Sequence, residues 1–267
     1  MKLLAVTGSR ADYGILTAAL KAVLADPFFQ IEELKLWGGG VPDAFGCAWF
    51  DTFPEMALLV GDRYEIMGAA LAFHLRRVPI AHIGGGDVTE GSYDDAMRDC
   101  ISRMASVHFA TSTAALVRLN GLGYRNVHLV GNPAVDFILE GTWKGPRPHA
   151  EPYVVVSYQA ETIDDTVDLD AVNAAINGRK AVWITPNPDR GNQRIPQGET
   201  FTHAEFLNLI HHCEEFIGNS SAILYEAPFM GVKTRMIGKR QRGRVIPWGG
   251  DGKVSERIRD VLRTCAF

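Results

Sequence analysis

Short apolar runs alternate with amphipathic stretches along the first half of the chain. The runs predict buried strands at Leu3–Val6, Leu34–Trp37, Met56–Val60, Ile80–Ile83, His108–Ala110 and His128–Val130. The stretches between them predict helices over Ala11–Ala25, Tyr64–His74, Tyr93–Met104 and Ala114–Leu119. Strands separated by helices in this order are typical of βαβ units built around a parallel sheet.

The same alternation restarts after a break in the pattern. Residues 140–152 hold two glycines and three prolines, and we predict a linker there. Beyond it, strands are predicted at Val154–Tyr158, Val182–Thr185, Glu215–Ile217 and Thr234–Ile237. Helices are predicted at Leu169–Ile176, His203–His212 and Ala222–Gly231.

The two halves predict an α/β fold with two Rossmann-like domains facing across a cleft. We expect the first domain over residues 1–140 and the second over residues 152–245. Residues 246–267 are expected to form a C-terminal segment whose helix packs back on the first domain. Because ligands of open parallel sheets collect at the carboxyl ends of the strands, we expect a ligand in the cleft between the domains.

Composition and charge narrow the class of protein. The 267 residues are 46% apolar, and the net charge of -4 supplies no overall basic field for nucleic acid or an anionic membrane. The four cysteines have neither CxxC nor zinc-ligand spacing, so we expect reduced thiols and no metal site. The N-terminal apolar run is too short for a signal peptide, and no run approaches the roughly 20 residues of a membrane span. We expect a cytoplasmic protein without membrane contact.

Two loops after predicted strands carry candidate site residues. In VTGSRADYG a strand runs into a glycine turn and a helix start, where free amides and Arg10 could attract phosphate. An ordinary turn with a surface arginine fits that motif equally well. In GDRYE, Asp62 and Arg63 follow a buried strand, where charges are costly unless they pair or bind a ligand. The alternative is Asp62 as a helix cap, with Arg63 paired to Glu65.

The longest polar motif, HIGGGDVTEGSYDD, begins inside a predicted strand. Its three successive glycines would allow a ligand to approach the backbone closely. Clustered carboxylates perturb one another's ionisation, so Asp87, Asp94 and Asp95 would suit proton transfer. His82 lies near them in the motif, and a lone histidine is more often structural than catalytic. The alternative is a flexible loop, with Asp95 paired to Arg98 at helical spacing.

Three motifs in the second half could bind a diphosphate. GNSSAILYEAP follows a strand and opens a helix, so Ser220 and Ser221 would offer hydroxyls and amides, and Glu226 an acceptor for ribose hydroxyls. A serine-capped helix is the plain alternative. GKRQRGR gathers four cations, which suit a polyanion, a nucleic-acid patch or a solvated loop. PNPDRG alone would be an ordinary turn.

Together these motifs resemble the hydrolysing UDP-N-acetylglucosamine 2-epimerases, in particular the bacterial sialic-acid and legionaminic-acid branch. The resemblance runs from Leu3 to Arg244 and also includes VGNPAVD. It implies the GT-B fold of twin Rossmann domains, and binding of a UDP-sugar without a cofactor or metal. It implies a reaction in which anti elimination of UDP gives a 2-acetamidoglucal, and hydration of the double bond releases N-acetylmannosamine.

The resemblance also implies roles for individual residues. Catalytic or acid/base carboxylates are implied at Asp62, Asp87, Asp94 and Asp95. Substrate contacts are implied for Arg10, Arg63, His82, Asn187, Asp189, Ser220, Ser221, Glu226, Arg240 and Arg244. Within that set Arg10 and the two serines would contact the pyrophosphate, and Glu226 the ribose. Members of the family often dimerise through the first domain, so a homodimer is one expectation.

The chain departs from the family pattern in length and at several positions. It is shorter than the usual member, mainly between Gly40 and Glu55. Gln159 and Asp99 stand where the family usually has histidines, the first of which is counted among its catalytic or substrate-positioning residues. Gly84 stands where some members have a glutamate. Because glutamine cannot exchange a proton near neutral pH as histidine can, sugar-nucleotide binding follows more directly than epimerisation.

Three functions therefore stay open, in this order. The carboxylates favour a hydrolysing 2-epimerase. A compact sugar-nucleotide glycosyltransferase would use the same fold and an acceptor such as a small molecule, a glycan or a modified nucleic-acid base. A catalytically inactive relative would bind a UDP-sugar without turning it over.

Overall fold

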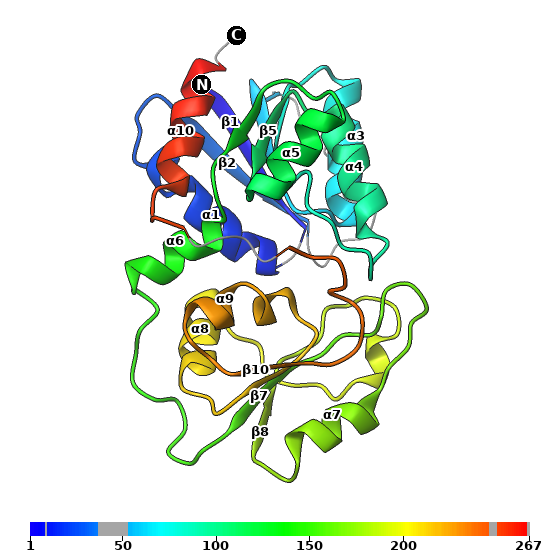
Figure 1. The fold of residues 1–267 in the computed structure, drawn as a ribbon. Coiled ribbons are helices and arrows are strands. Elements are labelled where there is room, and N and C mark those ends of the chain that lie inside the picture. The colour runs from blue at the N-terminus through cyan, green and yellow to red at the C-terminus, as the bar shows by residue number, and fades with distance from the viewer. Residues whose placement is uncertain (9, 37–52, 246–249, 266–267) are drawn as a thin grey trace. The chain divides into compact units, whose positions relative to one another are not determined.

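Two parallel β-sheets, one in each half of the chain, organise the computed structural model (Figure 1). The structure describes residues 1–8, 10–36, 53–245 and 250–265, and the side chains of residues 10–12 lie outside that description. The chain forms two compact units. The first comprises Met1–Val88, Asp94–Asp136 and Pro247–Phe267, and the second comprises Thr89–Tyr93 and Phe137–Ile246.

The first unit is built on a six-stranded parallel sheet with the order β2-β1-β3-β4-β5-β6. Its strands are β1 (Lys2–Thr7), β2 (Gln30–Lys35), β3 (Met56–Val60), β4 (Ile80–Ile83), β5 (Val107–Ala110) and β6 (Val127–Leu129). Its helices are α1 (Arg10–Leu24), α3 (Tyr64–Leu75), α4 (Asp94–Met104), α5 (Thr113–Gly121) and α10 (Val254–Thr264). A further helix, α6 (Pro133–Glu140), contains the boundary between the two units.

Helices cover both faces of this sheet. Leu3 and Ala5 of β1 pack with α1 and α10, whereas Leu4 and Val6 pack with α3. Figure 1 shows α1 and α10 side by side, and the Asp136 carboxylate accepts hydrogen bonds from the first amides of α10. Because both faces are buried, strands such as β3 consist of continuous apolar residues.

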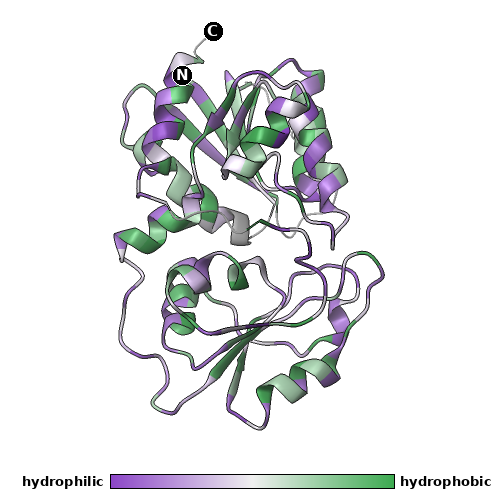
Figure 2. Ribbon diagram, in the orientation of Figure 1, coloured by the Kyte–Doolittle hydropathy of each residue, from purple (hydrophilic) through white to green (hydrophobic). Residues whose placement is uncertain are grey.

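The second unit has a four-stranded parallel sheet with the order β10-β9-β7-β8. Its strands are β7 (Val154–Ser157), β8 (Ala181–Trp183), β9 (Phe216–Gly218) and β10 (Thr234–Met236). Its helices are α7 (Leu169–Ile176), α8 (His203–His211) and α9 (Glu226–Phe229), with the 3-10 turns η2 (Asn192–Arg194) and η3 (Ser221–Ile223). Helix α8 packs on one face of the sheet with Val155, and α7 packs on the other with Val154 and Val156. In Figure 2 these helices carry both hydrophilic and hydrophobic residues, as expected for helices with one side on a sheet.

The fold is therefore α/β with two Rossmann-like units, as the sequence predicts. Two predicted elements differ from the structure by more than two residues at an end. The strand expected at Leu34–Trp37 is Gln30–Lys35, whose pattern is mostly polar because β2 is an edge strand. The helix expected at Ala222–Gly231 is broken into η3 and α9, since Pro228 lacks the N–H that a continuous helix would bond to Leu224.

Two further points concern the limits of the described chain. The segment that is short relative to the family lies mostly within residues 37–52, outside the described residues, as does Trp37. Within the described residues, none of the helices combines the length and the apolar character needed to cross a bilayer.

Candidate functional site

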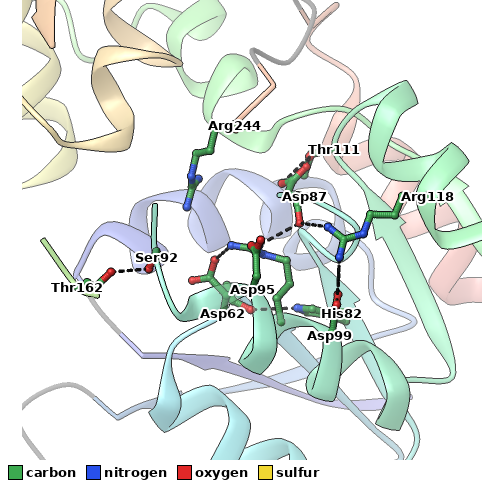
Figure 3. Close-up of polar contacts among 12 residues, drawn as sticks. Asp62, His82, Asp87, Ser92, Asp95, Asp99, Thr111, Arg118, Thr162 and Arg244 are labelled. Atoms are coloured by element: carbon green, nitrogen blue, oxygen red, sulfur yellow. Dashed lines mark hydrogen bonds and ion pairs between the residues drawn. The ribbon is translucent and has the colours of Figure 1, made fainter. Parts of the chain in front are cut away.

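Arg98 is the centre of the polar cluster at the carboxyl ends of β3 and β4. Its side chain is only 2% exposed, and it forms ion pairs with Asp62, which follows β3, and with Asp95 of α4. Figure 3 labels the two carboxylates, which lie close together. Burial alone would lower the pKa of Arg98, but the charges of Asp62 and Asp95 raise it above its ordinary value. Arg98 therefore stays charged, and it holds two of the predicted carboxylates together.

Asp87 joins this cluster through its backbone and its side chain. Arg98 donates to the Asp87 carbonyl at 2.9 Å, and Arg118 of α5 donates to the same oxygen at 3.3 Å. The Asp87 carboxylate oxygens each lie 3.1 Å from the Thr111 hydroxyl, which follows β5. The structure thus brings Asp62, Asp87 and Asp95 together. Asp94 lies beside Asp95 in the first turn of α4 and is half-buried.

His82 and Arg63 are engaged within the first unit. His82 is fully buried in β4, with Nδ1 3.1 Å from the Ser102 hydroxyl and Nε2 3.0 Å from the Gly61 carbonyl. Burial lowers its pKa to about 4, so the ring is neutral at physiological pH. Its two nitrogens support the turn before Asp62. Arg63 lies at the start of α3 and pairs with Glu65 at 3.1 Å, the alternative that the sequence allowed.

Gln159 lies in a buried amide network at the carboxyl end of β7. Its side-chain oxygen accepts from the Asn187 amide at 3.0 Å and from the Asn192 side chain at 2.7 Å. Its own backbone exchanges two hydrogen bonds with the Asn219 side chain, both at 2.8 Å. Because a backbone N–H can only donate, the Gln159 oxygen must face Asn187, which leaves its NH2 group to face elsewhere.

The serine motif forms a tight turn after β9. The Ser220 hydroxyl accepts from the Ala222 amide at 3.3 Å and begins η3, while Ser221 is the first residue of that turn. Both serines are half-buried. Since η3 has only three residues and α9 only four, any ligand here would be bound by single amides and hydroxyls rather than by a long helix dipole.

Glu226 lies at the start of α9, and its side chain is only 12% exposed. Its Oε1 is 4.0 Å from His203 Nε2, and His203 stacks on Phe137 with ring centroids 4.8 Å apart. Burial raises the pKa of Glu226 to about 7 and lowers that of His203 to about 4. Glu226 Oε2 is buried without a hydrogen-bond partner. Such an oxygen is suited to accept from a ligand hydroxyl.

The basic loop folds against the second sheet. Arg240 donates to the Ala160 carbonyl at 2.8 Å and lies 3.8 Å from the Asp189 carboxylate. The Arg244 guanidinium donates to the Tyr225 hydroxyl at 3.1 Å. The two arginines and Asp189 therefore belong to the same unit as the serine turn, as does Asn187.

Arg10 begins α1 directly after the β1 turn, but its side chain lies outside the described atoms.

Among the residues that the structure describes, no group of three or more His, Cys, Asp or Glu side chains could hold a metal ion.

Sequence reasoning missed several residues that complete these clusters. They are Thr111 and Arg118 beside Asp87, Asn192 and Asn219 beside Gln159, and His203 beside Glu226. Their only common sequence signal is a polar side chain in a loop, a turn or a helix. That signal is too common to select them.

Comparison with known proteins decides the family. Residues 43–248 match the family described as UDP-N-acetylglucosamine 2-epimerase. The chain belongs to this family. A polysialic acid biosynthesis protein of Escherichia coli is 26% identical over 91% of this chain and 80% of its own length. A hydrolysing UDP-N,N'-diacetylbacillosamine 2-epimerase of Legionella pneumophila is 23% identical over 98% of this chain and 96% of its own length.

A solved structure agrees with the fold. The UDP-GlcNAc 2-epimerase of Methanocaldococcus jannaschii, in complex with UDP-GlcNAc and UDP, matches with a TM-score of 0.75. The match covers 99% of this chain and all of that one, at 16% sequence identity. This 2-epimerase family member therefore has the GT-B type of α/β fold that its motifs imply.

Proposed function

We propose that the chain is a hydrolysing UDP-sugar 2-epimerase acting on UDP-N-acetylglucosamine or a related UDP-amino sugar. The observation that supports this most is the cluster in which Arg98 holds Asp62, Asp95 and the Asp87 backbone at the strand ends. Elimination followed by hydration needs carboxylates that take and return protons close to one sugar ring. The names of the Escherichia coli and Legionella relatives, which concern acidic and diamino sugars, point to the same substrate class.

The reaction would proceed in two steps. A carboxylate of the group Asp62, Asp87, Asp94 and Asp95 takes the proton from the sugar C2, the C1–O bond to UDP breaks, and a double bond forms between C1 and C2. Water then adds its hydroxyl to C1, a second group donates a proton to C2 from the other face, and the remaining proton of the water restores that group. The first carboxylate releases its proton to solvent. The products are UDP and the free 2-epimeric sugar.

The second unit would hold the nucleotide. Ser220 and Ser221 offer hydroxyls and amides to the diphosphate, with Arg240 and Arg244 as the matching cations of the same unit. The family resemblance also implies a diphosphate contact for Arg10, which belongs to the first unit. Glu226 would accept from the ribose hydroxyls, and Asn187 and Asp189 would line the same site. Gln159 can donate a hydrogen bond but cannot move a proton, so proton transfer falls to the aspartates.

Incubation with UDP-N-acetylglucosamine, followed by proton NMR, tests the proposal. Release of UDP together with free N-acetylmannosamine is expected. Asp62→Asn should reduce turnover by about 10²-fold or more while UDP affinity stays within about twofold, because the change affects proton transfer. Ser220→Ala and Arg10→Ala should weaken UDP itself. Asp170→Asn, at an exposed position in α7, is the matched control and should change neither quantity.

Other outcomes would replace the proposal. No turnover of UDP-N-acetylglucosamine or of its diamino relatives, with UDP still bound, would leave an inactive binding protein. Transfer of labelled sugar to an acceptor without free N-acetylmannosamine would indicate a glycosyltransferase. Equal UDP affinity in the Asp62, Ser220 and Arg10 variants would mean that these roles are misassigned.

Assembly and compartment complete the proposal. A homodimer is the assembly that the family resemblance implies, and light scattering of the purified chain measures it. A reducing cytoplasm suits the cysteines, because Cys100, Cys213 and Cys265 are free thiols and burial raises the pKa of Cys213 to about 11. Localisation of a tagged chain by fractionation checks this point.

A further inference from the structure

The glycine turn after β4 is wedged against two helices. A Cβ on Gly85 would lie 2.7 Å from the Ser102 hydroxyl of α4. A Cβ on Gly86, whose φ is +82°, would lie 2.5 Å from the Ala115 carbonyl of α5. Gly86 has a positive φ and no room for a Cβ beside a backbone carbonyl, so only glycine fits there, and the turn packs directly against the Ser102 hydroxyl and the Ala115 carbonyl. The next residue is Asp87.

An ion pair joins the same two helices beside this turn. Arg118 of α5 lies 3.0 Å from the Asp99 carboxylate of α4, and its other terminal nitrogen donates to the Asp87 carbonyl at 3.3 Å. Figure 3 shows Arg118 between Asp99 and Asp87. Asp99 therefore orients the guanidinium, and the guanidinium in turn contacts the backbone of Asp87.

Exposure indicates that this pair does little for stability. Arg118 is 30% exposed and Asp99 is 44% exposed, and ion pairs that water reaches contribute little to the free energy of unfolding. The contact with the Asp87 carbonyl is different, because it acts on one defined residue of the carboxylate cluster. Thr111 fixes the other end of Asp87 by donating to its carboxylate.

We propose that Arg118 and Asp99 form a positioning pair that sets the place of the Asp87 carboxylate for proton transfer. This inference rests on the proposed function, because Asp87 belongs to the carboxylates assigned there. In this role neither residue of the pair needs to contact the sugar. Their effect passes through the Asp87 backbone, and a misplacement of about 1 Å at a reacting group can cost about 10²-fold in rate.

Steady-state kinetics of four variants test the pair. Arg118→Met should lower kcat by about 10-fold or more while KM stays within about twofold, as expected when a supporting contact is lost. Asp99→Asn should lower kcat less. The double variant should be no slower than Arg118→Met alone, because both changes disrupt the same Arg118–Asp99 pair. Arg125→Met removes an exposed arginine before β6 and should have no effect.

Hydrogen exchange of the nucleotide-free protein provides a readout that needs no activity. The peptide containing residues 84–88 should exchange faster in Arg118→Met than in wild type, and at the wild-type rate in Arg125→Met. Unchanged exchange, or unchanged kcat, would overturn the positioning role. If exchange responds but the wild-type protein releases no epimerised sugar, then the proposed function fails and the control of the Asp87 turn by Arg118 stands.

Discussion

Replacement of Arg98 by methionine is the sharpest test of the first unit. The guanidinium is buried, pairs with Asp62 and Asp95, and donates to the Asp87 carbonyl at 2.9 Å. Methionine keeps much of the length of the side chain but has no donor. The substitution therefore removes the partner of two carboxylates and of one carbonyl at the same time.

The magnitude follows from burial. Removing one partner of a buried ion pair costs about 3–5 kcal/mol, because the remaining charge stays desolvated. The Asp62 and Asp95 side chains are 18% and 26% exposed, so water reaches both and reduces that cost. We expect the free energy of unfolding to fall by about 2–4 kcal/mol at neutral pH.

Urea denaturation followed by circular dichroism measures this loss, and hydrogen exchange of peptides from α4 assigns it to the first unit. The triple variant Asp62→Asn, Asp95→Asn, Arg98→Met is the matched comparison, since it removes both unpaired charges. It should recover at least half of the loss. A single variant within about 0.5 kcal/mol of wild type, or a triple variant no more stable than the single one, would refute the reasoning.

Three further substitutions test other parts of the fold. Burial raises the pKa of Glu226 to about 7 from an ordinary 4.5, so folding keeps a proton there and stability falls as pH rises through this window. The free energy of unfolding of Glu226→Gln, measured with heat or urea, should rise relative to that of wild type by about 3 kcal/mol between pH 4.5 and pH 7. A difference that does not depend on pH would contradict this. Gly218→Ala should cost about 2–3 kcal/mol of stability, because the φ of Gly218 is +137° and a Cβ there would lie 2.0 Å from the Ser157 carbonyl. Gly121→Ala is the control: a Cβ there meets open space, so the change should be neutral or stabilising. Ile258→Ala in α10 should cost about 2–5 kcal/mol, measured by the same unfolding, because the side chain is fully buried.

Strands that are buried on both faces can be predicted from the sequence. Met56–Val60 and Ile80–Ile83 have the predicted bounds, and every residue in them is buried. The edge strand β2 cannot be predicted from hydrophobicity. Its bounds, Gln30–Lys35, are set by backbone hydrogen bonds to β1, and the side chains of β2 are largely exposed. Hydrophobicity marks the centre of a parallel sheet better than its edges.

Local backbone chemistry explains the helices that the prediction missed or joined. α6 begins at Pro133, and the Asn132 side chain accepts from the Ala134 amide. Asparagine followed by proline is a helix-start signal, so helix α6 could have been predicted from the sequence. Pro228 likewise marks the break between η3 and α9. In both places a proline marks where a helix begins or is interrupted, and the apolar pattern alone does not show this.

The pairings of the candidate site are harder to predict than its residue types. Asp95 and Arg98 are three apart on a helix, so their ion pair was one of the stated alternatives. The pair between Arg98 and Asp62 joins residues 36 apart and depends on β3 lying next to β4. The choice of Arg98 as the common partner therefore required the fold.

Strand order explains how residues distant in the chain form each cluster. In the first sheet β3, β4 and β5 are neighbours, so the loops after them carry Asp62, Asp87 and Thr111 to one edge. In the second sheet β7 lies beside β9, and the residues that follow them, Gln159 and Asn219, hydrogen-bond directly. The polar groups meet because the strands meet. A one-residue slip in the register of β4 would therefore displace Asp87 from Thr111 and Arg98 even with every side chain present, which makes the cluster a property of the topology as much as of its residues.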